Sequence, residues 1–227
     1  MNQTFHFIAC SNRPFLMAEC RRYADRLYIP EGWNVEWTVI TDALSMTSGY
    51  NRAIGLHPGD AARTADAPVR IYLHQDVFLT NRWILHNLRD IFSAHPDIGM
   101  LGVAGAERMH PSGVWWSGAS IGCVYREDET PYEEERLAPD VHLQDVAVVD
   151  GFFLATAVDL PWREELFDGF DFYDVSQSYE MRRAGYRVVI PEMRYHWAVH
   201  DDGKVLSLDR YNHYRKVFLE HYEPEQS

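Results

Sequence analysis

The chain has 227 residues, a length that predicts one large domain or at most two small ones. Asp and Glu outnumber Lys and Arg by 34 to 21, and the net charge of −13 argues against a broad electrostatic surface for nucleic acid or anionic lipid. Because no apolar run reaches the roughly 20 residues that span a bilayer and the start MNQT lacks a basic signal-peptide region, we expect a cytoplasmic protein without an integral membrane segment.

The first hundred residues alternate between strand and helix patterns. Short apolar runs predict four strands, over 5–10, 35–40, 69–79 and 98–105. Helical patterns between these runs predict three helices, over 14–27, 46–56 and 81–96. Ser11 or Asn12 is the expected cap of the first helix and Asn81 that of the third. Four βα-type units with almost wholly apolar strands predict a mostly parallel sheet covered by helices on both faces.

The second half of the chain departs from this alternation. Residues 113–125 are rich in Gly and aromatic side chains, and 126–136 read as an exposed acidic loop. One or two strands are then expected over 141–158 and another over 186–190, with helices over 174–184 and 207–222. No repeat or long linker separates the halves, so we interpret residues 1–227 as a single α/β domain.

Polar residues follow the predicted strands at their carboxyl ends, where ligands bind in open parallel sheets. They include Ser11, Asp42 and the group His74-Gln75-Asp76. Asp76 comes after an almost wholly apolar run, so it must be paired or face a cleft. It is equally well explained as a turn residue before the next helix or as a ligand of Mg²⁺ or Mn²⁺.

A second group of acids, Asp168, Asp171 and Asp174, lies before and at the start of a predicted helix. Asp174 and Gln177 have the spacing of a capping box, which would account for this Asp without any catalytic role. A helix N-terminus also keeps a carboxylate ionised, as a general base for a hydroxyl group requires. The two roles are compatible.

Two further groups have a structural and a functional explanation each. His196 and His200 fall on one face of a predicted strand, where one of them could be a metal ligand, although a single His is more often structural. Trp115-Trp116 and Asp150-Gly151 could together form a platform for a sugar, since aromatic faces stack on C–H-rich rings and carboxylates bind hydroxyl groups. Tryptophans are, however, more often part of a core.

Five segments, in this order, resemble the family 2-like glycosyltransferases, in particular a compact branch related to a streptomycin-biosynthesis protein. They are GYNRAIG at 49–55, YLHQDVFL at 72–79, VVDGFFLAT at 148–156, FDGFDFYDVSQSYEMRRAGYRVV at 167–189 and VHDDG at 199–203. The resemblance implies a GT-A fold with a Rossmann-like sheet. It also implies transfer of a sugar, with inversion, from a UDP-, GDP- or dTDP-sugar donor to a hydroxyl group of a glycan or small-molecule acceptor.

The resemblance implies which acidic residues and histidines bind the metal ion and which acid is the catalytic base. Asp76 stands at the last acid of the family's DxD motif and His200 at a downstream His, so both would hold the Mn²⁺ or Mg²⁺ ion that bridges the donor diphosphate. His74 stands in place of the first acid. Asp174 matches the catalytic base, with Asp171 as the reserve base.

The resemblance also places the donor and the acceptor. Asp42 matches an acid that binds the nucleobase, Ser11 and Asn51 lie in nucleotide-binding segments, and Trp116 and Asp150 fall where sugar contacts are expected. Residues 1–105 are thus the expected nucleotide-binding half, and residues 106–227 the expected acceptor and catalytic half.

Two other functions remain open at this point. Tyr173, like His74, stands where the family has an acid, so a catalytically inactive protein that binds a nucleotide-sugar or a glycan is one alternative. A metal-dependent phosphohydrolase, in which the same carboxylates activate water, is the other.

Overall fold

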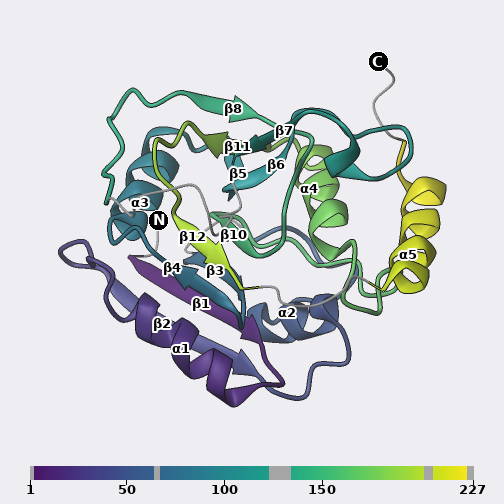
Figure 1. The fold of residues 1–227 in the computed structure, drawn as a ribbon, viewed down its shortest axis with the longest axis horizontal. Coiled ribbons are helices and arrows are strands. Elements are labelled where there is room, and N and C mark those ends of the chain that lie inside the picture. Colours follow the sequence, from purple (N-terminus) through teal and green to yellow (C-terminus); the bar gives the residue numbers. More distant parts are fainter. Residues whose placement is uncertain (1–2, 64–66, 123–133, 202–206, 224–227) are drawn as a thin grey trace.

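The computed structural model describes residues 3–63, 67–122, 134–201 and 207–223. In these ranges a seven-stranded sheet forms the centre of the molecule (Figure 1). Its strands, in spatial order, are β2 (Asn34–Ile40), β1 (Thr4–Cys10), β3 (Val69–His74), β10 (Phe153–Thr156), β5 (Ile98–Gly102), β11 (Arg187–Pro191) and β8 (Leu143–Asp145). Five of them run in one direction, whereas β10 and β8 are antiparallel to their neighbours. The predicted mostly parallel α/β sheet is confirmed.

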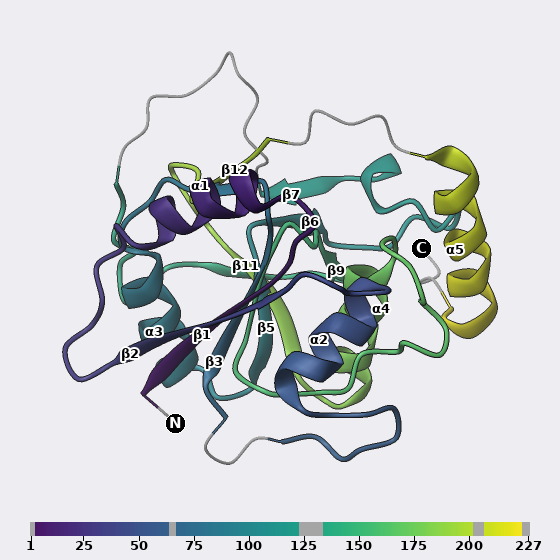
Figure 2. The ribbon, with the colours of Figure 1, turned by 90° about the horizontal axis from the view of Figure 1, so that it is seen from below.

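Helices cover both faces of this sheet, as Figure 2 shows. They are α1 (Pro14–Ala24), α2 (Met46–Ile54), α3 (Ile84–Ala94) and α4 (Tyr173–Arg183). Side chains alternate along a strand, so Phe7 of β1 packs with α1 and α3 in one hydrophobic cluster, while Ile8 packs with α2 and α4 in another. The sheet is therefore buried on both sides, which explains its almost wholly apolar strands.

The last helix, α5 (Leu208–His221), packs beside α4 at the outer edge of the molecule (Figure 1). Its aromatic residues meet those of α4 and of the turn before it. The ring of Tyr211 lies 4.8 Å from that of Phe172, and Phe218 lies 5.1 Å from Tyr179. No helix in the described ranges is long and apolar enough to cross a lipid bilayer.

Two small sheets lie beside the central one. β6 (Ala104–Ala106) pairs with both β7 (Ser120–Gly122) and β9 (Val148–Val149), near the short 3₁₀ helix η1 (Trp115–Ser117). β4 (Val77–Leu79) pairs antiparallel with β12 (Ala198–His200), so that His200 lies opposite Val77. The backbone N–H of Asp201 donates to the carbonyl of Asp76 at 2.9 Å. This pairing joins two segments far apart in the sequence, just beyond the carboxyl end of β3.

Several boundaries differ from those predicted. The run 69–79 is two strands, β3 and β4, because the chain turns at Gln75-Asp76. Residues 141–158 hold three strands rather than one or two. The fourth βα unit is wrong, since β5 is followed by β6 and not by a helix. Of the acidic loop, residues 126–133 lie outside the described residues.

The predicted helix caps are wrong as well. α1 has Arg13 at its N-cap, and α3 begins only at Ile84, so Asn81 lies upstream of it. At α1 the capping group comes from another part of the chain. The Oε1 atom of Gln75 accepts the backbone N–H groups of Asn12 and Arg13 at 3.1 and 2.9 Å. Local sequence could not predict this contact, because it joins residues more than sixty positions apart.

Candidate functional site

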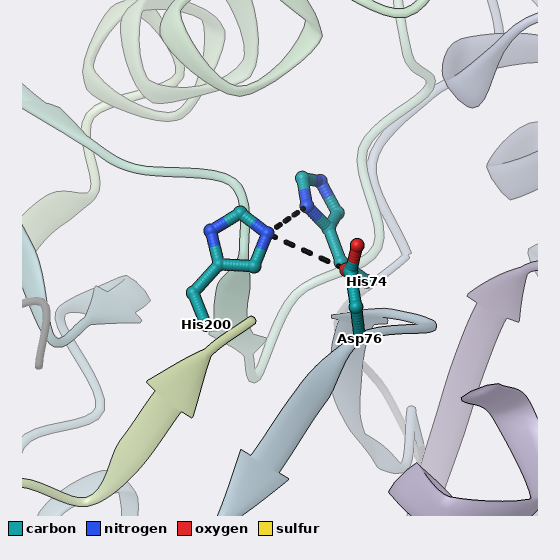
Figure 3. Close-up of side chains that lie close together, drawn as sticks. All are labelled: His74, Asp76 and His200. Atoms are coloured by element: carbon teal, nitrogen blue, oxygen red, sulfur yellow. Dashed lines mark hydrogen bonds and ion pairs between the residues drawn. The ribbon is translucent and has the colours of Figure 1, made fainter. Parts of the chain in front are cut away.

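Two imidazoles and a carboxylate meet at the carboxyl end of β3. His74 ends β3, Asp76 lies in the turn after it, and His200 ends β12. Figure 3 shows the His200 ring facing both other side chains. His200 Nε2 is 3.2 Å from His74 Nδ1 and 3.4 Å from Asp76 Oδ1. One donor atom from each of the three residues lies within 4.8 Å of the others, so the group has the compactness of a metal site.

The surroundings hold this cluster in place and keep its carboxylate ionised. The ring of Phe152 stacks on His200 at 5.3 Å and 8° between planes, which fixes the plane of the imidazole. Burial favours the neutral form of Asp76, but the hydrogen bond from His200 and the nearby His74 outweigh it and hold the pKa of Asp76 below its usual range. An ionised carboxylate and two imidazoles are a donor set that fits a divalent metal ion.

Asp174 lies in the first turn of α4, but not as the predicted capping box. The N-cap is Phe172, and Gln177 is buried with its side-chain N–H donating to the Leu160 carbonyl. Instead, the two carboxylate oxygens of Asp174 accept the backbone N–H groups of Val175 and Gly151, each at 2.8 Å. The carboxylate therefore joins α4 to the segment that leads into β10.

The pKa of Asp174 is raised to about 7, because burial and then the nearby Asp150 carboxylate disfavour its charge more than the two N–H groups favour it. A carboxylate with this pKa takes up and releases a proton near neutral pH. The backbone just before it is also unusual. Phe172 has φ = 62°, and within the described ranges it is the one residue other than Gly with a positive φ. Residues held in such conformations cluster at functional sites.

Tyr173 connects the cluster of His74, Asp76 and His200 with the carboxylate of Asp174. Its hydroxyl lies 2.5 Å from His74 Nε2, and its main chain is continuous with Asp174. The tyrosine packs directly over Gly151, where a Cβ atom would come within 2.0 Å of the hydroxyl oxygen. Gly151 thus permits this position of Tyr173 and also binds Asp174. The sequence marked Tyr173 only as a residue that stands where the family has an acid; its contact with His74, 99 positions away, is visible only in the fold.

The predicted tryptophan platform is divided between core and surface. Trp115 is buried, whereas Trp116 is 45% exposed and lies 5.1 Å from the ring of Tyr211 on α5. Asp150 accepts the backbone N–H of Phe152 at 3.0 Å and lies close enough to Asp174 to raise its pKa. Sequence reasoning missed Tyr211, for which α5 gave no signal beyond its helical pattern.

Other predicted site residues bind protein groups. The Ser11 hydroxyl donates to Gln75 at 2.9 Å, which places it next to the turn that carries Asp76. Asp42, at the end of β2, is exposed and paired with the Arg52 guanidinium.

Asp171 and Asn51 also have protein partners. Asp171 is paired with Arg210 of α5. Asn51 is buried in α2, where its carboxamide donates to the carbonyl of Trp162 at 2.9 Å and accepts its N–H at 2.7 Å. Both ends of the Asn51 amide are thus engaged by Trp162.

A family model described as a glycosyltransferase-like family matches residues 6–222. The chain belongs to this glycosyltransferase-like family. No curated protein matches its sequence. Among solved structures, this family member is similar to residues 1–349 of TarS from S. aureus, in complex with UDP-GlcNAc, at 10% identity and a TM-score of 0.51, over 100% of this chain and 68% of that one. This likeness shows a shared GT-A fold.

A second similar structure is the mannosyltransferase PcManGT from Pyrobaculum calidifontis, in complex with GDP-Man and Mn²⁺, at 13% identity and a TM-score of 0.45. The match covers 85% of this chain. The chain spans 58% of the length of that mannosyltransferase.

Proposed function

We propose that the protein is an inverting glycosyltransferase that moves a sugar from a UDP-, GDP- or dTDP-sugar to a hydroxyl group of a glycan or small-molecule acceptor. Asp174 is the base, with Asp171 in reserve, and Asp76 and His200 hold Mn²⁺ or Mg²⁺ at the donor diphosphate. We assign the donor to residues 1–105 and the acceptor to residues 106–227 of one domain. We place the chain in the compact, streptomycin-related branch of the family 2-like enzymes.

One observation carries this proposal: a carboxylate with a pKa of about 7 lies one residue from Tyr173, whose hydroxyl is hydrogen-bonded to the His/Asp/His cluster. A transferase needs a proton acceptor and a group that stabilises the departing diphosphate, close together but chemically separate. Family membership and the GT-A fold agree with this reading. The TarS and PcManGT structures contain nucleotide-sugars, UDP-GlcNAc and GDP-Man, and the latter also Mn²⁺.

In the proposed reaction, Asp174 accepts the proton of the acceptor hydroxyl as the hydroxyl oxygen attacks the anomeric carbon. Each of its carboxylate oxygens accepts one backbone N–H and has two lone pairs, which leaves capacity for that hydroxyl. The bond between the anomeric carbon and the diphosphate breaks with its electron pair on the diphosphate oxygen. When bound, a divalent ion supplies positive charge that offsets this developing negative charge.

Two surfaces near Asp174 are assigned to the sugars. The exposed ring of Trp116, next to Tyr211, offers an apolar face for the C–H groups of a sugar. Asp150 and the backbone of Gly151 lie beside the base and orient hydroxyl groups. Trp115 supports this surface from the core. Ser11 and Asp42, at the ends of β1 and β2, are assigned to the nucleotide.

The test is a nuclear magnetic resonance assay of the purified protein with UDP-, GDP- and dTDP-sugars, Mn²⁺ and a panel of hydroxyl acceptors. We expect one donor class to give a glycoside with inverted anomeric configuration. Asp174→Asn should lower transfer by about 10² or more, the scale of a lost general base, with donor affinity nearly intact. Asp171→Asn, made alongside, tests the reserve base, whose carboxylate is paired with Arg210.

The other outcomes identify the alternatives. Equal turnover in Asp174→Asn, with loss in Asp171→Asn, would move the base to Asp171. Donor binding without turnover on any acceptor would indicate a catalytically inactive binding protein. Release of phosphate from simple phosphate esters without an acceptor would indicate a phosphohydrolase.

A further inference from the structure

We propose that His74 is a third metal ligand, bound through Nδ1 and oriented by Tyr173, and that the resulting site selects a first-row transition metal such as Mn²⁺ over Mg²⁺. The inference rests on the proposed function only in placing the same ion at the donor diphosphate. His74 occupies a position where the resemblance implies an acid, so without it the cluster would have one carboxylate and one imidazole.

Two of the three donor separations fit a shared ion, and the third lies within 4.8 Å. Two ligands that each lie about 2.1 Å from one ion, at tetrahedral to octahedral angles, are about 3.0–3.4 Å apart. The observed separations are 3.2 Å from His74 Nδ1 to His200 Nε2 and 3.4 Å from His200 Nε2 to Asp76 Oδ1. Figure 3 shows the three side chains converging from β3, the turn after it and β12.

The second nitrogen of His74 has the partner that a metal-bound imidazole requires. A ligating His almost always donates its other N–H to a fixed acceptor, which sets the tautomer and leaves the first nitrogen's lone pair for the metal. Here His74 Nε2 faces the Tyr173 hydroxyl at 2.5 Å. With the proton on Nε2, the lone pair of Nδ1 points toward His200 and the centre of the cluster.

The position of Tyr173 is fixed by the residues packed around it. It is buried at the start of α4, with ring contacts to Tyr50 at 5.9 Å and to Trp162 at 6.1 Å. Gly151 lacks the Cβ atom that would clash with the hydroxyl, so Tyr173 packs directly against this backbone. Tyr173 is therefore a positioning residue, which orients the His74 ring from a rigid part of the fold.

The donor set explains the metal preference. Mg²⁺ selects oxygen ligands and keeps several waters, whereas imidazole nitrogen favours first-row transition metals, among which Mn²⁺ binds most weakly. Two of the three protein donors here are imidazole nitrogens. Replacing one imidazole by a carboxylate gives a site with two carboxylates and one imidazole. His74→Asp restores the two-acid pattern and should shift the preference toward Mg²⁺.

The test measures metal binding to the full chain after EDTA treatment, with no nucleotide or acceptor present. Calorimetry should give a Kd for Mn²⁺ at least about 10-fold lower than that for Mg²⁺. His74→Ala and Tyr173→Phe should each weaken Mn²⁺ binding by about 10- to 100-fold. Electron spin echo spectra of bound Mn²⁺ should show coupling to two imidazole nitrogens in the wild type and to one in His74→Ala.

Controls keep these results interpretable. His57→Ala removes an exposed imidazole outside the cluster and should leave Mn²⁺ binding unchanged. The circular dichroism spectrum and Tm of each variant show whether it folds, and the His74→Asp variant tests selectivity without removing a donor.

Any of three results would overturn the assignment. The wild type and His74→Ala could bind Mn²⁺ with equal affinity, or Mn²⁺ bound to the wild type could couple to only one imidazole nitrogen. The third is an unchanged ratio of the Mn²⁺ and Mg²⁺ dissociation constants in His74→Asp. Metal binding as described, combined with no transfer in the assay above, would reject the proposed function and leave this inference standing.

Discussion

The raised pKa of Asp174 makes the stability of the protein depend on pH in a way that one substitution removes. The folded state holds the Asp174 proton up to about pH 7, whereas the ordinary pKa of this carboxyl is 3.8. Its contribution to stability is therefore fully present below about pH 4 and is lost as the pH rises through 7. The pH dependence of the wild type should include this loss, and that of Asp174→Asn should not.

The size of the effect follows from the two pKa values. Between pH 5.5 and pH 8 the unfolded carboxyl is already ionised, while the folded one loses its proton, at a cost to stability of about 2 kcal/mol. We expect the wild type to lose about 2 kcal/mol more of its free energy of unfolding over this interval than Asp174→Asn does. The comparison across pH cancels the constant cost of placing an amide against two backbone N–H groups.

The assay is urea unfolding in EDTA, followed by tryptophan fluorescence at several pH values. Asp42→Asn is the matched control, because the ordinary pKa of this carboxyl, 3.8, already lies below this interval and the hydrogen bond from Arg52 lowers it further. Parallel stability profiles for the wild type and Asp174→Asn would mean that folding does not raise the pKa of Asp174. The same pKa predicts that kcat/KM rises with pH up to about 7 and then levels off.

Four further substitutions test other residues of the fold and of the proposed site. Asn51→Ala leaves the N–H and carbonyl of Trp162 without their buried partner, so urea unfolding should show a loss of about 2–4 kcal/mol, and calorimetry no selective loss of nucleotide binding. Trp116→Ala should raise the KM for the acceptor several-fold with Tm nearly unchanged, whereas Trp115→Ala should destabilise the fold by about 3–5 kcal/mol; the reverse pattern would count against the platform. Asp76→Ala should abolish the difference between nucleotide affinities measured with and without Mn²⁺, and an unchanged difference would contradict its assignment.

The elements with a strong local pattern could be predicted from the sequence. The apolar run 5–10 is β1 in all but one residue, and α4 begins one residue before its predicted start at Asp174. A strand buried on both faces is a run of apolar residues, and a helix has a regular spacing of apolar residues with a clear end. Both patterns lie within a short stretch of sequence, so they can be recognised locally. The same holds for the polar residues at the strand ends, His74 and Asp76 among them.

What failed depends on contacts between distant segments. Gln75 accepts the backbone N–H groups at the start of α1, where Ser11 or Asn12 was the expected cap, and the Asn51 amide binds Trp162, 111 positions away. The hydrogen bond between His74 and Tyr173 bridges 99 positions. A pattern of residue types cannot reveal which of several polar side chains meets which backbone group, because the sheet order brings these segments together only in the folded chain.

The most direct test of the proposed nucleotide-sugar site is a calorimetric titration of UDP, GDP and dTDP into the protein, first with Mn²⁺ and then with EDTA. We expect one diphosphate to bind in the presence of Mn²⁺ and EDTA to remove most of its affinity. Failure of all three to bind in the presence of Mn²⁺ would contradict the account, because the cluster at the end of β3 would then not serve a nucleotide-sugar.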